Sequence, residues 1–145
     1  MYETLRMIHS VLRYLILMGG IGAIIVLAGN ARARAKAMST TFLMFTHLQA
    51  LTGLILYFFA TPWFGMLRDN AGEVMKNKVY RFFAVEHPLM MLIAVVLITI
   101  GNSKVKKALK NETKFTPALV LFVIALLVIF AAIPWPFRDL ERGWL

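Results

Sequence analysis

The sequence predicts an all-α membrane protein built as a four-helix up-down transmembrane bundle. The first observation is composition: 60% of the 145 residues are hydrophobic, and the mean hydropathy is +0.73. Such a chain is too apolar for an ordinary soluble domain of this length. The second is the presence of four apolar stretches that each meet the requirement of ~20 residues for a membrane-spanning helix. These predicted spans cover about residues 9–29, 41–61, 82–101 and 115–135.

The four predicted spans take up nearly the whole chain, so we expect one domain over residues 1–145 with no separate soluble module. The first span begins at His9. The second lies inside an uncharged run of residues 37–67, and the fourth carries no charge at all. The third contains Glu86 and His87.

The distribution of charge predicts which side of the membrane the connecting segments face. The formal net charge is +9, and two segments, residues 30–40 and 102–115, are strongly basic. Their basic residues are Arg32, Arg34, Lys36, Lys104, Lys106, Lys107, Lys110 and Lys114, with Glu112 as an acid. In an up-down bundle both segments lie on the same side, and the positive-inside rule makes that side cytoplasmic. Both chain termini are then expected outside the cytoplasm. We interpret the charge as a membrane signal and expect no nucleic-acid site.

Prolines and aromatic residues mark the ends of the predicted helices. Pro62 ends the second span, because proline pushes the preceding residue out of helical geometry. A short interfacial helix is expected in the following linker, over about residues 73–80. Pro134 ends the fourth span, and an aromatic belt at the membrane interface is expected after it. The belt residues are Trp135, Phe137 and Trp144.

The three histidines of the chain, His9, His47 and His87, fall on three different predicted spans. An ionisable side chain in hydrocarbon costs roughly 2–3 kcal/mol or more, so each of them needs a partner or a function. Histidine is well suited to hold a haem iron between helices. Each histidine taken alone also fits a buried neutral residue bonded to a hydroxyl or a backbone carbonyl. Their joint occurrence on three helices favours a cofactor or metal role.

Two arginines accompany the first histidine. Arg6, His9 and Arg13 share one face of the first predicted helix, because they are three and four residues apart. Arg6 and Arg13 are therefore candidates for pairing with haem propionates, although arginines near a membrane end also extend to lipid headgroups. Glu86 has a predicted depth similar to that of Arg13. We expect an Arg13–Glu86 ion pair, which would offset the cost of both charges.

Other kinds of site have weaker support. A zinc or two-metal centre could draw on His9, His47, Glu86 and His87, but no two of them have the spacing that places two ligands on one helix face. Cysteine is absent, which excludes disulfides, cysteine-ligated iron–sulfur clusters and covalent attachment of a c-type haem. The sequence also contains no glycine-rich phosphate loop. A metal- or proton-handling membrane protein is a third interpretation of the histidines.

Three segments of the chain resemble a known family. They are IHSVLRY at residues 8–14, THLQALTGLILY at 46–57 and RFFAVEHP at 81–88, and the run LIAVVLITIG at 92–101 continues the match. The family is that of the small four-helix membrane proteins of Bacteroidetes labelled cytochrome b-like. The resemblance covers most of the chain, and all three histidines fall in the matching segments. It implies a non-covalently bound haem b and a place in the bacterial inner membrane.

The leading hypothesis is therefore an integral membrane b-type cytochrome that carries electrons to or from a quinone pool or a respiratory-complex subunit. We expect an electron carrier or subunit more than a stand-alone enzyme, and a homo-oligomer is compatible with the sequence. The runner-up is a non-enzymatic accessory subunit or assembly partner of a larger membrane complex. In that case the histidines complete polar networks within the bundle.

Among the histidines, His87 is the expected axial ligand of the iron. It lies inside a span beside a charged residue, and Pro88 can bend the helix at this point. We rank His47 above His9 as the second ligand. His47 lies inside an uncharged span, whereas His9 is close enough to the membrane interface to be hydrated.

Overall fold

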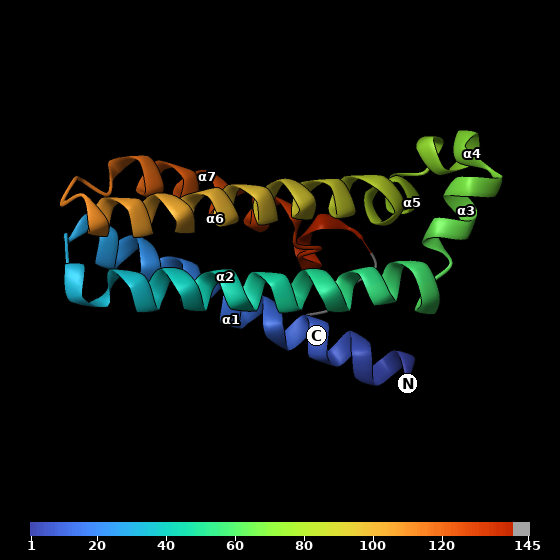
Figure 1. The fold of residues 1–145 in the computed structure, drawn as a ribbon. Coiled ribbons are helices and arrows are strands. Elements are labelled where there is room, and N and C mark those ends of the chain that lie inside the picture. The colour runs from blue at the N-terminus through green and yellow to red at the C-terminus, as the bar shows by residue number, and fades with distance from the viewer. Residues whose placement is uncertain (141–145) are drawn as a thin grey trace.

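Helices make up most of residues 1–140, which are the residues that the computed structural model describes. The long helices, labelled in Figure 1, are α1 (Tyr2–Ala28), α2 (Arg32–Ile55), α6 (His87–Lys110) and α7 (Thr116–Ala132). Two π-helical turns interrupt the regular geometry: η1 (Leu56–Ala60) extends α2, and η2 (Phe82–Glu86) precedes α6. A 3₁₀ turn, η3 (Pro136–Arg138), follows α7. Trp144 of the predicted aromatic belt lies outside the described residues.

The prediction of an all-helical chain is confirmed for residues 1–140, and several of the helices have the length and composition that a membrane span requires. Among residues 1–140, three helical segments are long and apolar enough to cross a bilayer: Tyr2–Ala28, Arg32–Ala60 and Lys78–Lys110. The fourth predicted span corresponds to α7, which has 17 residues and a rise of roughly 26 Å at 1.5 Å per residue. It ends at Ala132 because Ile133 is extended and Pro134 follows. Whether α7 crosses the membrane stays a prediction.

The helices are longer than predicted at the end where the basic segments lie. α2 already begins at Arg32, and α6 continues to Lys110. The predicted segments 30–40 and 102–115 are therefore helical over most of their length, and the connections shrink to residues 29–31 and 111–115. Arginine and lysine are good helix formers, so the end of an apolar run does not end the helix.

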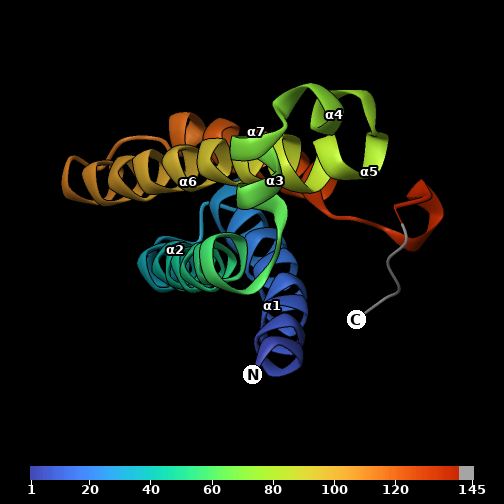
Figure 2. The same cartoon turned by 90° about the vertical axis from the view of Figure 1, so that its right-hand side faces the viewer.

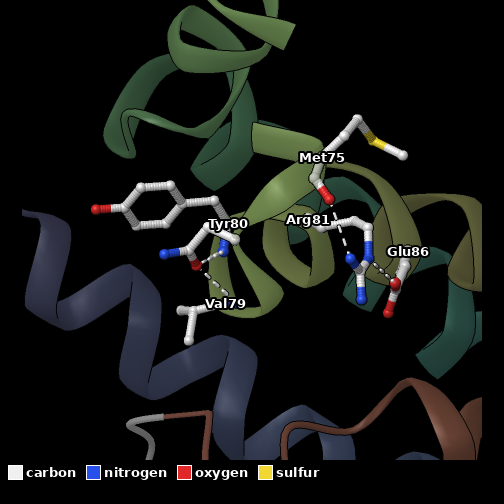
Figure 3. A network of polar contacts seen from close by, with 6 residues as sticks. Met75, Val79, Tyr80, Arg81 and Glu86 are labelled. Atoms are coloured by element: carbon white, nitrogen blue, oxygen red, sulfur yellow. Dashed lines mark hydrogen bonds and ion pairs between the residues drawn. The ribbon is translucent and has the colours of Figure 1, made fainter. Parts of the chain in front are cut away.

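The linker after α2 forms three short helices. The helix predicted over residues 73–80 is present but is divided into two at Asn77. The helices are α3 (Trp63–Asp69), α4 (Ala71–Lys76) and α5 (Lys78–Arg81). Asn77 interrupts the predicted helix because its backbone is extended, with φ −92° and ψ 123°. Its side-chain oxygen accepts hydrogen bonds from the backbone N–H groups of Val79 (2.9 Å) and Tyr80 (3.1 Å), which caps α5 (Figure 3).

The long helices pack side by side in the order in which they follow along the chain. α1 lies against α2, α2 against α6, and α6 against α7, and α7 also contacts α1. The two short connections lie at one end of the molecule, and α3, α4 and α5 gather at the other end (Figure 1). The N-terminal half of α1 diverges from the other long helices in both views (Figures 1 and 2).

The interior near the two connections is closely packed. Phe42 of α2 meets Phe122 of α7 edge to face, with ring centroids 5.3 Å apart, and both side chains are fully buried. Gly101 of α6 lies directly against the Phe122 ring, and a Cβ at that position would collide with it. A buried polar contact crosses the same region, where the Ser39 hydroxyl donates to the Asn102 side-chain oxygen at 2.5 Å.

Candidate functional site

The structure brings two histidines together in the half of the molecule near α3–α5. His9 of α1 and His87 at the start of α6 have ring centroids 6.2 Å apart, and the ring planes cross at 71°. The two residues are 78 positions apart in the sequence, so the fold alone creates this pair. Both side chains are partly buried.

His87 is held by the backbone at the end of α7. Its Nδ1 lies 2.7 Å from the carbonyl oxygen of Ala132. A carbonyl oxygen only accepts, so Nδ1 carries the proton and donates it. In the neutral ring the lone pair is then on Nε2, which is the atom that is free to bind a metal.

His9 is held in the same way by a side chain of α2. Its Nδ1 lies 3.1 Å from the hydroxyl oxygen of Thr52. That hydroxyl donates to the Leu48 carbonyl (3.1 Å) or to the Gln49 carbonyl (3.0 Å), so it accepts from His9. Nε2 of His9 therefore also keeps its lone pair. Gly53 leaves room for the ring, since a Cβ there would lie 3.0 Å from His9 Cε1.

A cavity of about 470 Å³ adjoins the two histidines. Most of its lining is apolar or aromatic, with contributions from Trp63 and Phe83. Gln49 is one of the uncharged polar residues of the lining. It is 5% exposed, and its Oε1 is buried without a hydrogen-bond partner among the described residues. The cavity therefore combines a mostly apolar lining with a few polar residues, as small-molecule sites commonly do.

The two π-helical turns meet at the cavity. Pro88 has no N–H and cannot donate to the Ala84 carbonyl four residues earlier, as a regular helix requires. The Tyr57 hydroxyl of η1 donates to that carbonyl instead, at 2.8 Å. This contact joins η1 to η2 one turn before His87. π-helical turns are rare and often occur at functional sites, and here they set the position at which α6 presents His87.

His47 lies away from this pair. Its side chain is exposed on the outer face of α2, and its Nδ1 donates to the Leu43 carbonyl of the same helix at 2.9 Å. The ranking of His47 above His9 as the partner of His87 is therefore opposed by the geometry. The residues of α2 that face the interior are Ala35, Ser39, Phe42, Thr46 and Gln49.

The two predicted propionate partners, Arg6 and Arg13, both line the cavity. Arg6 also pairs with Glu3 of its own helix at 2.7 Å and is partly exposed. Arg13 is buried, with 9% exposure, and donates to the Tyr14 hydroxyl at 3.0 Å. Arg6, His9 and Arg13 thus all contribute to the lining of one cavity.

The predicted Arg13–Glu86 ion pair is wrong. Within residues 1–140, Glu86 pairs with Arg81, whose Nε lies 2.8 Å from Oε1 of Glu86, and Arg81 also donates to the Met75 carbonyl at 3.0 Å (Figure 3). The reason is local geometry. A π-helical turn aligns residues five positions apart, and η2 places Glu86 above Arg81.

Two further findings bear on the kind of site. Among the described residues, no group of three or more histidine, cysteine or acidic side chains is placed so that it could hold a metal ion. No family model matches the chain, and no significant match was found among the curated proteins or the solved structures. The resemblance to the cytochrome b-like family therefore stays a prediction.

Proposed function

We propose that this chain is a multi-pass protein of the bacterial inner membrane that binds one haem b between α1 and α6 and carries electrons. In this proposal α1, α2, α6 and α7 form a four-helix up-down transmembrane bundle. The observation that carries the proposal is the His9–His87 pair, with both Nδ1 atoms held by the protein and both Nε2 atoms left as ligands. His9 therefore replaces His47 as the proposed second ligand.

The two rings lie close together, with centroids 6.2 Å apart, so both histidines would hold the same iron. A backbone carbonyl bonded to Nδ1, as at His87, is also one of the usual ways in which a protein orients a ligating histidine.

The other residues of the cavity have roles that follow from their chemistry. Arg6 and Arg13 would neutralise the two propionates, and Arg13 is the more rigidly placed because it is buried. The apolar lining would exclude water from the porphyrin ring and keep the local dielectric low. The haem would supply reversible one-electron chemistry, and His9 and His87 would be the residues that hold its iron. Such a site suits a carrier that exchanges electrons with a quinone pool or a partner subunit.

One observation favours the alternative of a non-enzymatic accessory subunit or assembly partner. The hydrogen bonds that hold His9 and His87 satisfy one nitrogen of each ring without any cofactor. These bonds fit a purely structural network that fixes α1, α2 and α7 around α6. The two proposals differ in whether the Nε2 atoms bind iron.

An absorption spectrum of the detergent-purified protein, oxidised and then reduced with dithionite, tests the proposal. We expect sharp reduced bands of a b-type haem. His9→Ala and His87→Ala should each abolish haem content per folded protein, whereas His47→Ala, the matched control, should leave it unchanged. A colourless protein after haem supplementation would refute the haem site. Loss of haem in the His47 variant, with full haem in the His9 variant, would restore the original ranking.

A further inference from the structure

One end of the molecule carries a concentration of positive charge that the haem proposal does not use. This basic end comprises the last turns of α6, the first turns of α2 and the connection of residues 111–115. Its exposed basic side chains are Arg34, Lys36, Lys104, Lys106, Lys107, Lys110 and Lys114. Glu112 is the acid among them.

The protein itself supplies almost no counter-charge at the basic end. Within residues 1–140, the ion pairs are Glu3–Arg6, Arg68–Asp69, Glu73–Lys76 and Arg81–Glu86. All of them lie at the opposite end, in the first turns of α1 and in α3–η2. There the Arg68 guanidinium, hydrogen bonded to Asp69, lowers the pKa of that carboxyl below its usual value. The cations of the basic end therefore need anions from outside the chain.

The backbone that presents these cations is held in place. Arg32 donates to the Ala108 carbonyl (2.8 Å) and the Thr113 carbonyl (3.0 Å), and its guanidinium lies 5.1 Å from the centre of the buried Phe115 ring. These contacts tie the start of α2 to the end of α6 and to the following connection. The lysines thus project from a fixed surface and not from a loose loop.

The position of the lysines matches the headgroup layer of a bilayer. A bilayer is about 40–45 Å thick with its headgroups and about 30 Å without them, which leaves about 5–8 Å on each side. Lys104 and Lys110 are six residues apart on α6, a rise of about 9 Å. Both follow the apolar run that ends near Gly101. The row of lysines therefore spans the depth at which lipid phosphates lie.

We propose that the basic end binds the headgroups of anionic phospholipids. Lysine ammonium groups act as point charges without the planar fork of arginine, so the surface selects for negative charge and not for one headgroup structure. Each lysine near an anionic surface contributes about fivefold in affinity. The proposal does not depend on haem, and it holds or fails separately from the His9–His87 site.

The test compares lipids retained by the full-length protein. Wild type is reconstituted in vesicles of phosphatidylcholine with a minority of phosphatidylglycerol, extracted gently, and analysed by native mass spectrometry. The test variant combines Lys104→Gln, Lys107→Gln and Lys110→Gln. The matched control combines Arg68→Gln, Lys76→Gln and Lys78→Gln, which removes the same charge from the opposite end. Circular dichroism establishes that all three proteins are equally helical.

We expect wild type and control to retain phosphatidylglycerol over phosphatidylcholine, and the test variant to lose this preference by roughly tenfold or more. Raising the salt concentration should weaken the preference of wild type in the same way, a result that needs no variant to fold. Soluble glycerol phosphate should not displace the lipid. Equal retention in the test variant, equal loss in the control, or a salt-independent preference would overturn the proposal. Displacement by glycerol phosphate would assign the surface to free phosphates.

Discussion

The two halves of the molecule use the same long helices in different ways. Near the basic end, α1, α2, α6 and α7 are regular and touch closely, as the Phe42–Phe122 contact and Gly101 show. Near α3–α5, α1 diverges from the other long helices (Figure 1). In this half the helices also contain π-helical turns, and a cavity of about 470 Å³ remains. Both histidines of the pair lie in the second half. Regular packing gives the bundle its stability, and the departures from it make room for the site.

The two ends of the molecule should differ completely in whether a reagent outside the cell can reach them. Single cysteines introduced as Arg34→Cys and Asn70→Cys lie at opposite ends, and both positions are exposed. An impermeant thiol reagent added to intact cells should label position 70 and not position 34, because the positive-inside rule predicts that the basic end faces the cytoplasm. Permeabilised cells should label both. Labelling of 34 alone in intact cells would invert the topology.

The largest energetic effect is expected in the closely packed half. Phe122 is fully buried, so Phe122→Ala should lower the free energy of unfolding by about 3–5 kcal/mol. Leu127 lies on the same helix with 66% exposure. Leu127→Ala should therefore change the free energy of unfolding by less than about 0.5 kcal/mol. Unfolding in mixed micelles with a denaturing detergent measures both. Similar values for the two variants would show that α7 is not packed as described.

A smaller effect is expected where η1 meets η2. Tyr57→Phe removes the donor to the Ala84 carbonyl and should cost about 1–3 kcal/mol, the penalty of a buried acceptor left without a partner. Pro88→Ala restores an N–H that can reach the same carbonyl. In that background Tyr57→Phe should cost clearly less, so a double-mutant cycle should show coupling between positions 57 and 88. Additive effects would mean that the missing proline N–H does not explain the contact.

The smallest effect concerns the charged pair beside the site. Arg81 and Glu86 are 37% and 40% exposed, so their coupling free energy should be about 0–1 kcal/mol in a cycle built from Arg81→Gln and Glu86→Gln. The cycle of Arg13→Gln with Glu86→Gln serves as the control and should show no coupling. Stronger coupling of Glu86 with Arg13 than with Arg81 would restore the ion pair predicted from the sequence.

Hydropathy alone located the long helices, because membrane-spanning segments must be apolar over a fixed length. Hydropathy could not predict how each helix is rotated about its own axis. The choice between His9 and His47 as the second ligand depended on that rotation. A usable signal was present in α2, where Ser39, Thr46 and Gln49 recur at helical spacing and mark the interior face, as polar uncharged residues do in membrane helices. His47 follows Thr46 by one residue and therefore points about 100° away from it.

The hydrogen-bond acceptors of His9 and His87 could not be predicted from the sequence, for two different reasons. Thr52 is one of several hydroxyl residues in its segment, and only the fold shows that it faces His9. Ala132 contributes a backbone oxygen, which every residue type possesses. Pro88 did indicate an irregular helix beside His87. The sequence does not show that the irregularity is a π-helical turn, which pairs Glu86 with Arg81 and accepts a hydrogen bond from Tyr57.

The hydrogen bonds that hold His9 and His87 differ in whether a substitution can remove the acceptor. His87 donates to a main-chain oxygen at position 132, so the identity of that side chain does not matter to the bond. His9 donates to the side chain of Thr52, which a single codon change can remove. Sequence variation can therefore loosen or strengthen the hold on one ring while the other stays fixed. Position 52 is thus the place where the basicity and orientation of one histidine can be adjusted without disturbing its partner.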